Sequence, residues 1–416
     1  MKVIVLGAGI IGVSTAYYLA RAGHEVVVLD RQPAPGLETS FANGGQISAS
    51  HAQPWANPAT LAKLPGWLLR GDAPLWFRPR LDPAMWAFFL RFLAHCTPAR
   101  ARDNGEKALR LALYSRDSLQ ELRAETGIEF AAVDRGILHI YRSARDLARA
   151  AAVAERFRAL GLETQDINAN ACVGIEPALS AVHDQLAGAI YSPADLSGDA
   201  HAFTEALAKH ASDAGVEFRM DTKIVRIAQM GGRVTGILTQ RGMVTGNAYV
   251  CALGSYSTPL LRDIGMPLPI YPAKGYSATV PLNTPHSAPR TSLTDDDHKI
   301  VISRIGDTLR IAGTAEFDGY NTQINERRAR TVLDAGMKLF PGVMEADQAE
   351  FWTGLRPLTP DSVPVIGATR LGNLYINSGH GTLGWTMGCG SGRAMAELIS
   401  GRDPGLDLNG FGPDRF

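Results

Sequence analysis

Cysteine is scarce in this sequence, and no two cysteines form a recognisable pair. Only four occur among 416 residues, and they stand singly at Cys96, Cys172, Cys251 and Cys389. The absence of a C-x-x-C pair excludes a zinc ribbon and a thioredoxin-type redox motif. Scattered single cysteines are typical of a reducing compartment, so we expect a cytoplasmic protein with no bound metal.

The sequence also lacks an excess of charge of either sign and a long hydrophobic run. Its 41 basic residues balance 41 acidic ones, which gives a formal net charge of zero. A nucleic-acid-binding protein would usually be basic, so we expect no nucleic acid as a partner. No apolar run reaches the roughly 18 residues of a membrane span. The first residues resemble a strand more than a secretory signal peptide.

What remains is the composition of an ordinary globular protein, with 45% hydrophobic and 20% charged residues. A chain of 416 residues exceeds the usual size of one hydrophobic core. The length therefore predicts two domains.

The first thirty residues contain the most informative motif. Residues 2–6 form a continuous apolar run, which predicts a strand buried in a parallel sheet. A helical segment follows, and a second apolar strand at residues 25–29 ends in Asp30. Between the first strand and the helix lies a G-x-G-x-x-G motif formed by Gly7, Gly9 and Gly12.

Each glycine of this motif would have a physical task in binding a dinucleotide. Gly7 would permit the tight turn, Gly9 would let the backbone approach a pyrophosphate, and Gly12 would let the helix pack on the strand. The helix N-terminus offers free N–H groups to phosphates. Asp30 is placed to accept hydrogen bonds from a ribose. The motif predicts a Rossmann-like domain but leaves NAD and FAD open.

Further motifs occur along nearly the whole chain. They lie at residues 6–12, 37–48 (LETSFANGGQIS), 254–258 (GSYST), 271–276 (YPAKGY), 351–361 (FWTGLRPLTPD) and 379–392 (GHGTLGWTMGCGSG). Together they resemble the D-amino acid oxidase/glycine oxidase superfamily of FAD-dependent oxidoreductases, and within it the small-subunit family of bacterial D-amino acid dehydrogenases. The resemblance implies an α/β fold in which a Rossmann-like FAD-binding domain, a parallel sheet of βαβ units, joins a second α+β substrate domain on a mixed or antiparallel sheet.

The alternation of strands and helices is regular at both ends of the chain and in one middle piece. We therefore predict a discontinuous FAD-binding domain made of residues 1–50, 199–261 and 353–416. The substrate-binding domain would comprise residues 51–198 and 262–352.

The resemblance implies FAD rather than NAD as the cofactor. The residues expected around its ADP half are Gly7, Gly9, Ile10, Ile11, Gly12, Asp30 and Arg31. The residues expected along the rest of the cofactor are Thr39, Ser40, Asn43, Gly44, Gly45, Gln46, Gly254, Gly379, His380, Gly381, Thr382 and Leu383. The last five would bring a helix N-terminus toward the pyrimidine end of the flavin, which gains negative charge on reduction.

The same resemblance implies that Arg356, in the sequence Gly-Leu-Arg-Pro, pairs with the substrate carboxylate. A planar guanidinium can bind both carboxylate oxygens with parallel N–H groups. Related oxidases often add a tyrosine from a strand that we place at residues 297–300, and this sequence has none there. We call the residues that bind the substrate carboxylate the carboxylate clamp. The candidates for its members besides Arg356 are Tyr276, His51, Tyr320 and His298. The first two join Arg356 in our predicted catalytic site.

The implied reaction is oxidative deamination of a D-amino acid to a 2-oxo acid and ammonia. Hydride would pass from the α-carbon to flavin N5, and the electrons would pass on to a quinone or another non-oxygen acceptor. Glycine, sarcosine, D-proline and D-hydroxyproline would fit the same clamp and remain alternative substrates. An NAD-dependent dehydrogenase and a non-catalytic nucleotide-binding protein remain alternatives of other classes.

Residues 51–100 interrupt the α/β pattern and are rich in proline and tryptophan. Asp82 followed by Pro83 predicts the start of a helix that runs to about His95. It is too short to span a bilayer, and we expect it to pack in the second domain or against another subunit. The alternative is contact with the cytoplasmic face of the inner membrane. The basic residues that would face anionic lipid are Arg70, Arg78, Arg80 and Arg91.

Overall fold

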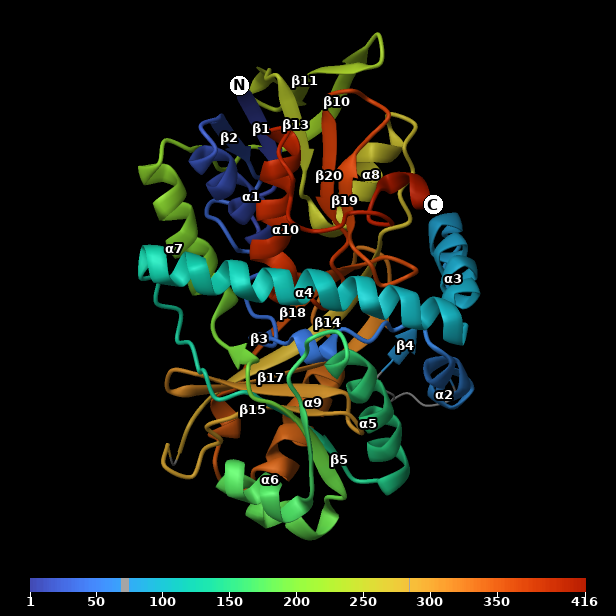
Figure 1. The fold of residues 1–416 in the computed structure, drawn as a ribbon, viewed down its shortest axis with the longest axis vertical. Helices are drawn as coiled ribbons and strands as arrows, with labels where there is room; N and C mark the ends of the chain where they lie inside the picture. The colour runs from blue at the N-terminus through green and yellow to red at the C-terminus, as the bar shows by residue number, and fades with distance from the viewer. Residues whose placement is uncertain (69–74, 284) are drawn as a thin grey trace.

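The computed structural model describes residues 1–68, 75–283 and 285–416 (Figure 1). Arg70 lies outside the described residues, as does the side chain of Trp67. Two large sheets lie one above the other along the long axis of the molecule, and the long helix α4 (Pro98–Thr126) crosses the view between them.

The upper sheet has six strands in the order β19-β20-β13-β1-β2-β9. Five strands are parallel and only β19 runs antiparallel to its neighbour. The N-terminal strand lies inside the sheet, with Val5 paired to Val28 on one side and Val250 on the other. The strands are β1 (Lys2–Leu6), β2 (Glu25–Leu29), β9 (Glu217–Arg219), β13 (Ala248–Cys251), β19 (Val365–Ala368) and β20 (Leu374–Ser378). This is the predicted Rossmann-like parallel sheet.

Four helices pack in the core beside this sheet. They are α1 (Ile10–Arg21), α4, α7 (Ala200–Asp213) and α10 (Gly384–Ile399). Two glycines let α10 lie unusually close to its neighbours. A Cβ on Gly392 would stand 2.7 Å from Ser14 of α1, and one on Gly390 would stand 2.6 Å from Ser115 of α4. The C-terminal helix is thereby fixed against the N-terminal one.

The lower sheet has nine strands in the order β18-β14-β17-β16-β15-β5-β7-β6, with β4 beside β17. The pairs β15–β5 and β17–β4 are parallel and the others are antiparallel, which confirms the predicted mixed sheet. Helix α9 (Glu326–Leu339) packs on β14, β17 and β16. The strands are β4 (Leu75–Phe77), β5 (Ile137–Tyr141), β6 (Gln165–Ile167), β7 (Gly188–Ser192), β14 (Tyr271–Pro281), β15 (Ser292–Asp295), β16 (Ile300–Ile305), β17 (Thr308–Phe317) and β18 (Glu350–Leu358).

Smaller elements complete the described fold. The short sheets contain β3 (Gln46–Ile47), β8 (Leu196–Ser197), β10 (Ile224–Met230), β11 (Arg233–Thr239) and β12 (Gly242–Val244). The remaining α-helices are α2 (Pro58–Leu68), α3 (Pro83–His95), α5 (Ala144–Arg158), α6 (Ala169–Ile175) and α8 (Ser257–Arg262). The short 3₁₀ helices are η1 (Ala49–His51), η2 (Pro177–Gln185), η3 (Gly254–Tyr256), η4 (Ala346–Gln348) and η5 (Pro413–Arg415). The domain boundaries remain a prediction, and α4 packs on α10 across one of them.

Two sequence interpretations were wrong. Residues 297–299 form a turn before β16, because the Asp295 carboxylate accepts the backbone N–H groups of Asp297 and His298. The sequence indicates a strand near residues 188–191, which is β7, but the rest of residues 162–199, which it indicates to be loop-rich, contains α6 and η2. Both begin at side-chain caps, from Asn168 and Glu176.

Helix α3 begins where the Asp-Pro pair predicted, with the Asp82 carboxylate accepting the N–H of Ala84. One face packs inward through Met85, Phe88 and Phe92. The other face is also apolar but exposed, with Leu90 70% accessible to solvent and Trp86 and Leu93 over 40%. Within the described ranges, no helix has the length and hydrophobicity needed to cross a membrane.

Candidate active site

A cavity of about 740 Å³ lies where the two sheets meet, within the size range of ligand sites. Its wall includes every predicted cofactor residue except Gly12 and Gly379. Gly12 instead packs on the glycine turn, since its Cβ would stand 1.9 Å from the Gly7 carbonyl oxygen. Gly379 has a φ of +79° and a Cβ there would stand 2.8 Å from Thr359, so it shapes the chain before the cavity.

The N-terminus of α1 opens into one end of the cavity. Gly9 caps the helix without a side chain, and no acidic residue occupies its first turn. Gly7 has a φ of +107°, and a Cβ there would stand 2.6 Å from the Ala252 carbonyl oxygen, so only glycine fits. The Ser40 hydroxyl accepts the N–H of Ile10 at 3.0 Å. An unneutralised helix dipole beside a bare backbone turn suits a pyrophosphate.

Asp30 and Arg31 stand at the same end. The Asp30 carboxylate accepts the N–H groups of Ala8 at 2.6 Å and Gln32 at 2.8 Å, and burial raises its pKa. Arg31 lies over the ring of Tyr256 at 3.9 Å and pairs with Glu38. Asp30 therefore holds the glycine turn in addition to any bond it makes to a ribose.

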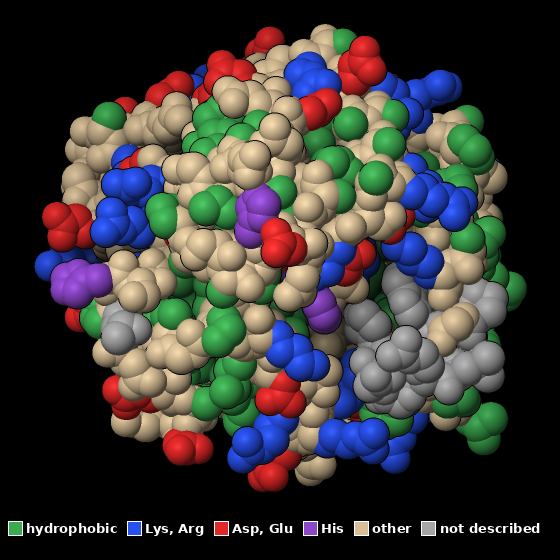
Figure 2. Space-filling model, turned by 90° about the horizontal axis from the view of Figure 1, so that it is seen from below, with side chains coloured by type: hydrophobic (Ala, Val, Ile, Leu, Met, Phe, Trp, Pro, Cys, Tyr) green, Lys and Arg blue, Asp and Glu red, His purple; other side chains and the backbone are tan. Residues whose placement is uncertain are grey.

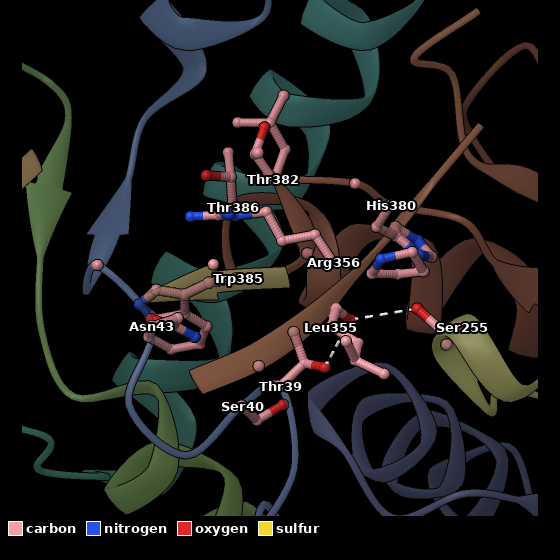
Figure 3. A pocket seen from close by; sticks show the side chains of 18 of the residues that line it. Thr39, Ser40, Asn43, Ser255, Leu355, Arg356, His380, Thr382, Trp385 and Thr386 are labelled. Carbon is pink, nitrogen blue, oxygen red and sulfur yellow. Dashed lines mark hydrogen bonds between the residues drawn. The ribbon is translucent and has the colours of Figure 1, made fainter. Parts of the chain in front are cut away.

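A second helix N-terminus, that of α10 near the C-terminal end of the sequence, also faces the cavity (Figure 3). It too lacks a side-chain cap and an acidic residue in its first turn. His380 precedes it, with Nε2 3.1 Å from the Ser391 hydroxyl. Burial lowers the pKa of His380 to about 3, so its ring is neutral, and its Nδ1 has no partner within the described part of the chain. Two positive helix ends facing one cavity suit a long anionic cofactor with an electron-accepting ring.

Residues 39–46, which are expected to run along the flavin and are called the flavin loop below, form a third wall of the cavity. This loop is bonded to the lower sheet. Ser277 donates to the Ala42 carbonyl at 2.7 Å, and Ser303 donates to the Gly44 carbonyl at 2.8 Å. The Gln46 amide donates to Ser292 at 2.9 Å. The sheet thus holds the loop in place by side-chain bonds, leaving the loop backbone to contact a ligand.

Arg356 lies on β18 in the wall of the cavity. One terminal nitrogen, Nη1, donates to the Thr314 carbonyl at 2.7 Å. No carboxylate lies within 4.0 Å of the guanidinium among the described residues. Burial lowers the pKa of Arg356 to about 10, which still leaves it protonated at neutral pH. A buried cation without an anion fits a site for a carboxylate ligand.

The four candidates for the rest of the clamp separate into two groups. Tyr276 and His51 line the cavity, whereas Tyr320 and His298 do not. The Tyr276 hydroxyl donates to Glu316 at 2.6 Å, which directs it toward that buried carboxylate. Among the described residues, the His51 ring has no hydrogen-bond partner and stacks on His139, with ring centres 5.7 Å apart.

Asp195, Ser50 and His139, which the sequence did not indicate, fix the backbone next to His51. Asp195, almost fully buried, accepts the N–H groups of Ala49 and Ser50 and the hydroxyls of Ser48 and Ser50. Ser50 in turn lies 2.7 Å from Nε2 of His139, in the cavity wall. These contacts hold the segment that carries His51. The only signal was a histidine inside an apolar strand (GILHIY), because Asp195 belongs to no local motif.

Comparison with known proteins agrees with this geometry. The D-amino acid dehydrogenase of Paramagnetospirillum magneticum is 54% identical over 417 residues, which cover 100% of this chain and 99% of that protein. That of Dechloromonas aromatica is 52% identical and covers 97% and 98%. The crystal structure of glycine oxidase from Geobacillus kaustophilus has the same fold, with a TM-score of 0.77 at 23% identity over 100% of this chain and 99% of that chain.

The family description "FAD dependent oxidoreductase" matches residues 2–398. The prediction of FAD as the cofactor is confirmed, and the residues of the cavity fit it. The chain belongs to this family of FAD-dependent oxidoreductases, and it is an enzyme that oxidises amino acids with FAD.

Proposed function

We propose that the enzyme oxidises D-amino acids to imino acids, which water then hydrolyses to 2-oxo acids and ammonia. The observation that carries the proposal is the protonated guanidinium of Arg356 in the wall of the FAD cavity, which has no anionic partner among the described residues. Relatives over 50% identical are named D-amino acid dehydrogenases, which favours a D-amino acid over the alternatives.

FAD, when bound, supplies the acceptor for the two electrons and the hydrogen that leave the α-carbon. Arg356 would bind the substrate carboxylate through two N–H groups and so fix which face of the α-carbon is presented. Residues Gly7–Ile11, Asp30 and Arg31 would hold the ADP half, and Asn43–Gln46 and His380–Leu383 would hold the flavin. A substrate that binds with a neutral amine needs no separate base at the α-carbon, and we assign none.

Anaerobic mixing with D-alanine and L-alanine, followed by flavin absorbance, tests this function. We expect D-alanine to bleach the flavin and L-alanine to leave it oxidised. A flavin that neither D-alanine nor a panel of D-amino acids reduces would contradict the proposal. Reduction only by glycine, sarcosine, D-proline or D-hydroxyproline would favour the alternative substrate class.

We also propose that the electrons pass to a quinone or similar carrier at a membrane surface rather than to oxygen. The exposed apolar face of α3, formed by Trp86, Leu90 and Leu93, supports a surface contact. Arg91 lies on the same helix, whereas Arg78 and Arg80 both pair with buried Asp318. At the end of the molecule that Figure 2 shows, described acidic and basic side chains are interspersed.

Sedimentation with anionic liposomes tests this contact. The double variant Leu90→Gln, Leu93→Gln should lose liposome binding and keep dye-linked activity. Leu160→Gln, at a 41% exposed leucine on another surface, should change neither. A wild-type enzyme that stays in the supernatant would contradict the membrane contact, and fast turnover with oxygen would contradict the acceptor.

A further inference from the structure

The guanidinium of Arg356 lies flat across the neighbouring strand β14 at a glycine. A Cβ built on Gly275 would stand 2.2 Å from Nη1, 2.3 Å from Cζ and 2.5 Å from Nη2 of Arg356. These three atoms span the head of the side chain. Any residue larger than glycine would therefore occupy the space in which the guanidinium lies.

On its other side β14 pairs with β17, and this pairing is irregular opposite Gly275. Lys274 pairs with Glu316 and Tyr276 pairs with Gly313, so two residues of β17, Thr314 and Ala315, stand opposite Gly275. This two-against-one arrangement is a β-bulge, a device that redirects groups beside active sites. Its first residue, Thr314, has a φ of +54°, which is rare for a β-branched side chain.

The bulge turns a backbone acceptor toward the arginine. The Thr314 carbonyl receives Nη1 of Arg356 at 2.7 Å. In a regular antiparallel ladder the carbonyls of β17 would point along the sheet to neighbouring strands. The strained residue thus supplies the hydrogen bond that sets the rotation of the guanidinium.

The backbone beside Arg356 is anchored from the cofactor side. Thr39 donates to the Leu355 carbonyl at 3.0 Å, and the Ser255 hydroxyl donates to the same oxygen at 3.2 Å (Figure 3). Thr39 belongs to the predicted flavin loop and Ser255 to the turn after β13. The strand that carries Arg356 is therefore fixed by two segments that line the FAD cavity.

We propose that Gly275 and the bulge at Thr314 form a seat for the guanidinium, and that both are positioning residues for the binding of the substrate carboxylate. Gly275 provides the flat surface and Thr314 provides the acceptor that orients one edge. Nη2 makes a longer bond of 3.5 Å to the Gly313 carbonyl of the same strand, and the remaining N–H groups are left for the ligand. This inference rests on the proposed role of Arg356 in substrate binding.

The variant Gly275→Ala tests the seat. The atoms it displaces belong to the end of a flexible side chain beside a cavity, so the fold should survive while the guanidinium moves. We expect KM for D-alanine to rise about tenfold or more, with kcat changed much less, because carboxylate binding is weakened. Flavin content and the melting temperature should stay close to wild type.

Gly336→Ala is the matched control. Gly336 lies on α9 behind the same strand, where an added Cβ would press on Ile311 of β17 at 2.8 Å without touching Arg356. It should leave KM unchanged. An equal rise of KM in Gly336→Ala would show a general distortion of β17 and overturn the proposal.

A double-mutant cycle separates positioning from a structural effect. In the background Arg356→Gln, the change Gly275→Ala should no longer alter KM, because there is no guanidinium to displace. Additive effects of the two changes would overturn the seat. If D-alanine never reduces the wild-type flavin, the proposed function fails; if it does, and Gly275→Ala behaves as wild type, only the seat fails.

Discussion

At the scale of single residues, the chemistry of the cavity depends on a cation held without an anion. Among the described residues, no carboxylate compensates the charge of Arg356, and its short hydrogen bond is to the backbone carbonyl of Thr314. Leaving a buried charge unpaired is costly for stability. A ligand carboxylate would remove that cost, which makes ligand binding favourable at this point of the wall.

Replacement of Arg356 by leucine should therefore abolish substrate capture without loss of the cofactor. Removing one member of a buried charge pair costs about 2–5 kcal/mol, so kcat/KM for D-alanine should fall by about 30-fold to 5,000-fold. The protein should remain yellow, because Arg356 belongs to β18 and not to the glycine turn or α10. Steady-state assays and the flavin spectrum measure the two effects. Turnover at the wild-type rate would contradict the assignment.

Buried histidines predict how stability depends on pH. Burial lowers the pKa of both His139 and His380 to about 3, from 6.5. In the folded state they stay neutral until the pH approaches 3, whereas the unfolded chain protonates them below 6.5. The unfolded state thus binds more protons in this window, and stability falls as the pH drops from 6.5 to 3, by about 1.4 kcal/mol per unit for each histidine.

The variant His139→Gln should show a shallower decline between pH 6.5 and 5.0, by about 2 kcal/mol over the window. Urea denaturation of the FAD-saturated enzyme at several pH values measures it. His51 stacks on His139 and Asp296 acts on it electrostatically, so both remain unchanged in the comparison. His183→Gln, at a surface site, is the control. Equal slopes for His139→Gln and wild type would contradict the prediction.

The sequence could indicate the glycine turn, because its strand, glycines and helix are adjacent along the chain. It indicated Arg356 only through the resemblance of its Gly-Leu-Arg-Pro sequence to a known family. It could not indicate Asp195 or Thr314. Asp195 acts on Ser48–Ser50 across about 145 positions of sequence, and the left-handed Thr314 arises only from the pairing of β17 with β14. The missing tyrosine at residues 297–300 was sought on a strand, and the segment proved to be a turn.

At the scale of elements, helix ends illustrate how local sequence and tertiary contact combine. Asp82 caps α3 through Oδ1, while its Oδ2 accepts the Tyr271 hydroxyl at 2.8 Å. Asn168 caps α6 through a single bond to the N–H of Ala171. The first residue thus ties a helix to the lower sheet, and the second stabilises only its own helix.

Asp82→Ala should consequently destabilise the protein more than Asn168→Ala does. Loss of a cap costs about 1 kcal/mol in both. Asp82→Ala also leaves the Tyr271 hydroxyl unpaired, at a further cost of about 1–3 kcal/mol. Equilibrium urea denaturation measures the difference. Equal destabilisation by the two variants would show that the Tyr271 contact contributes nothing.

Strands and helices with strong periodicity were predicted close to their true limits. Strands β1 and β2 agree residue for residue with the apolar runs at residues 2–6 and 25–29. Helix α6 was missed because seven residues contain barely two turns of pattern. For α3, the sequence indicated packing in the second domain or against another subunit, with membrane contact as the alternative. One face of α3 packs in the core, and the opposite face is apolar and exposed.

At the scale of the whole molecule, the cavity lies between the two large sheets. The glycine turn and α10 come from the upper sheet, and Arg356 and the bulge come from the lower one. A cofactor that touches both would act as a bridge between them. Ligands that bind only the folded state stabilise it by mass action.

Removal of FAD should therefore lower the melting temperature, and adding it back should restore it in a concentration-dependent way. At a free FAD concentration of about 100 times Kd, the gain is about 2.7 kcal/mol. ADP is the control ligand, since in the proposed binding mode it would occupy only the end of the cavity lined by Gly7–Ile11, Asp30 and Arg31. Because ADP bound in this way would not reach the flavin loop or β18, protection of that loop from proteolysis should require FAD, even at ADP concentrations that raise the melting temperature. Equal protection of the loop by ADP would show that the adenine end alone orders the cavity, and that the bridge between the sheets is not made by the cofactor.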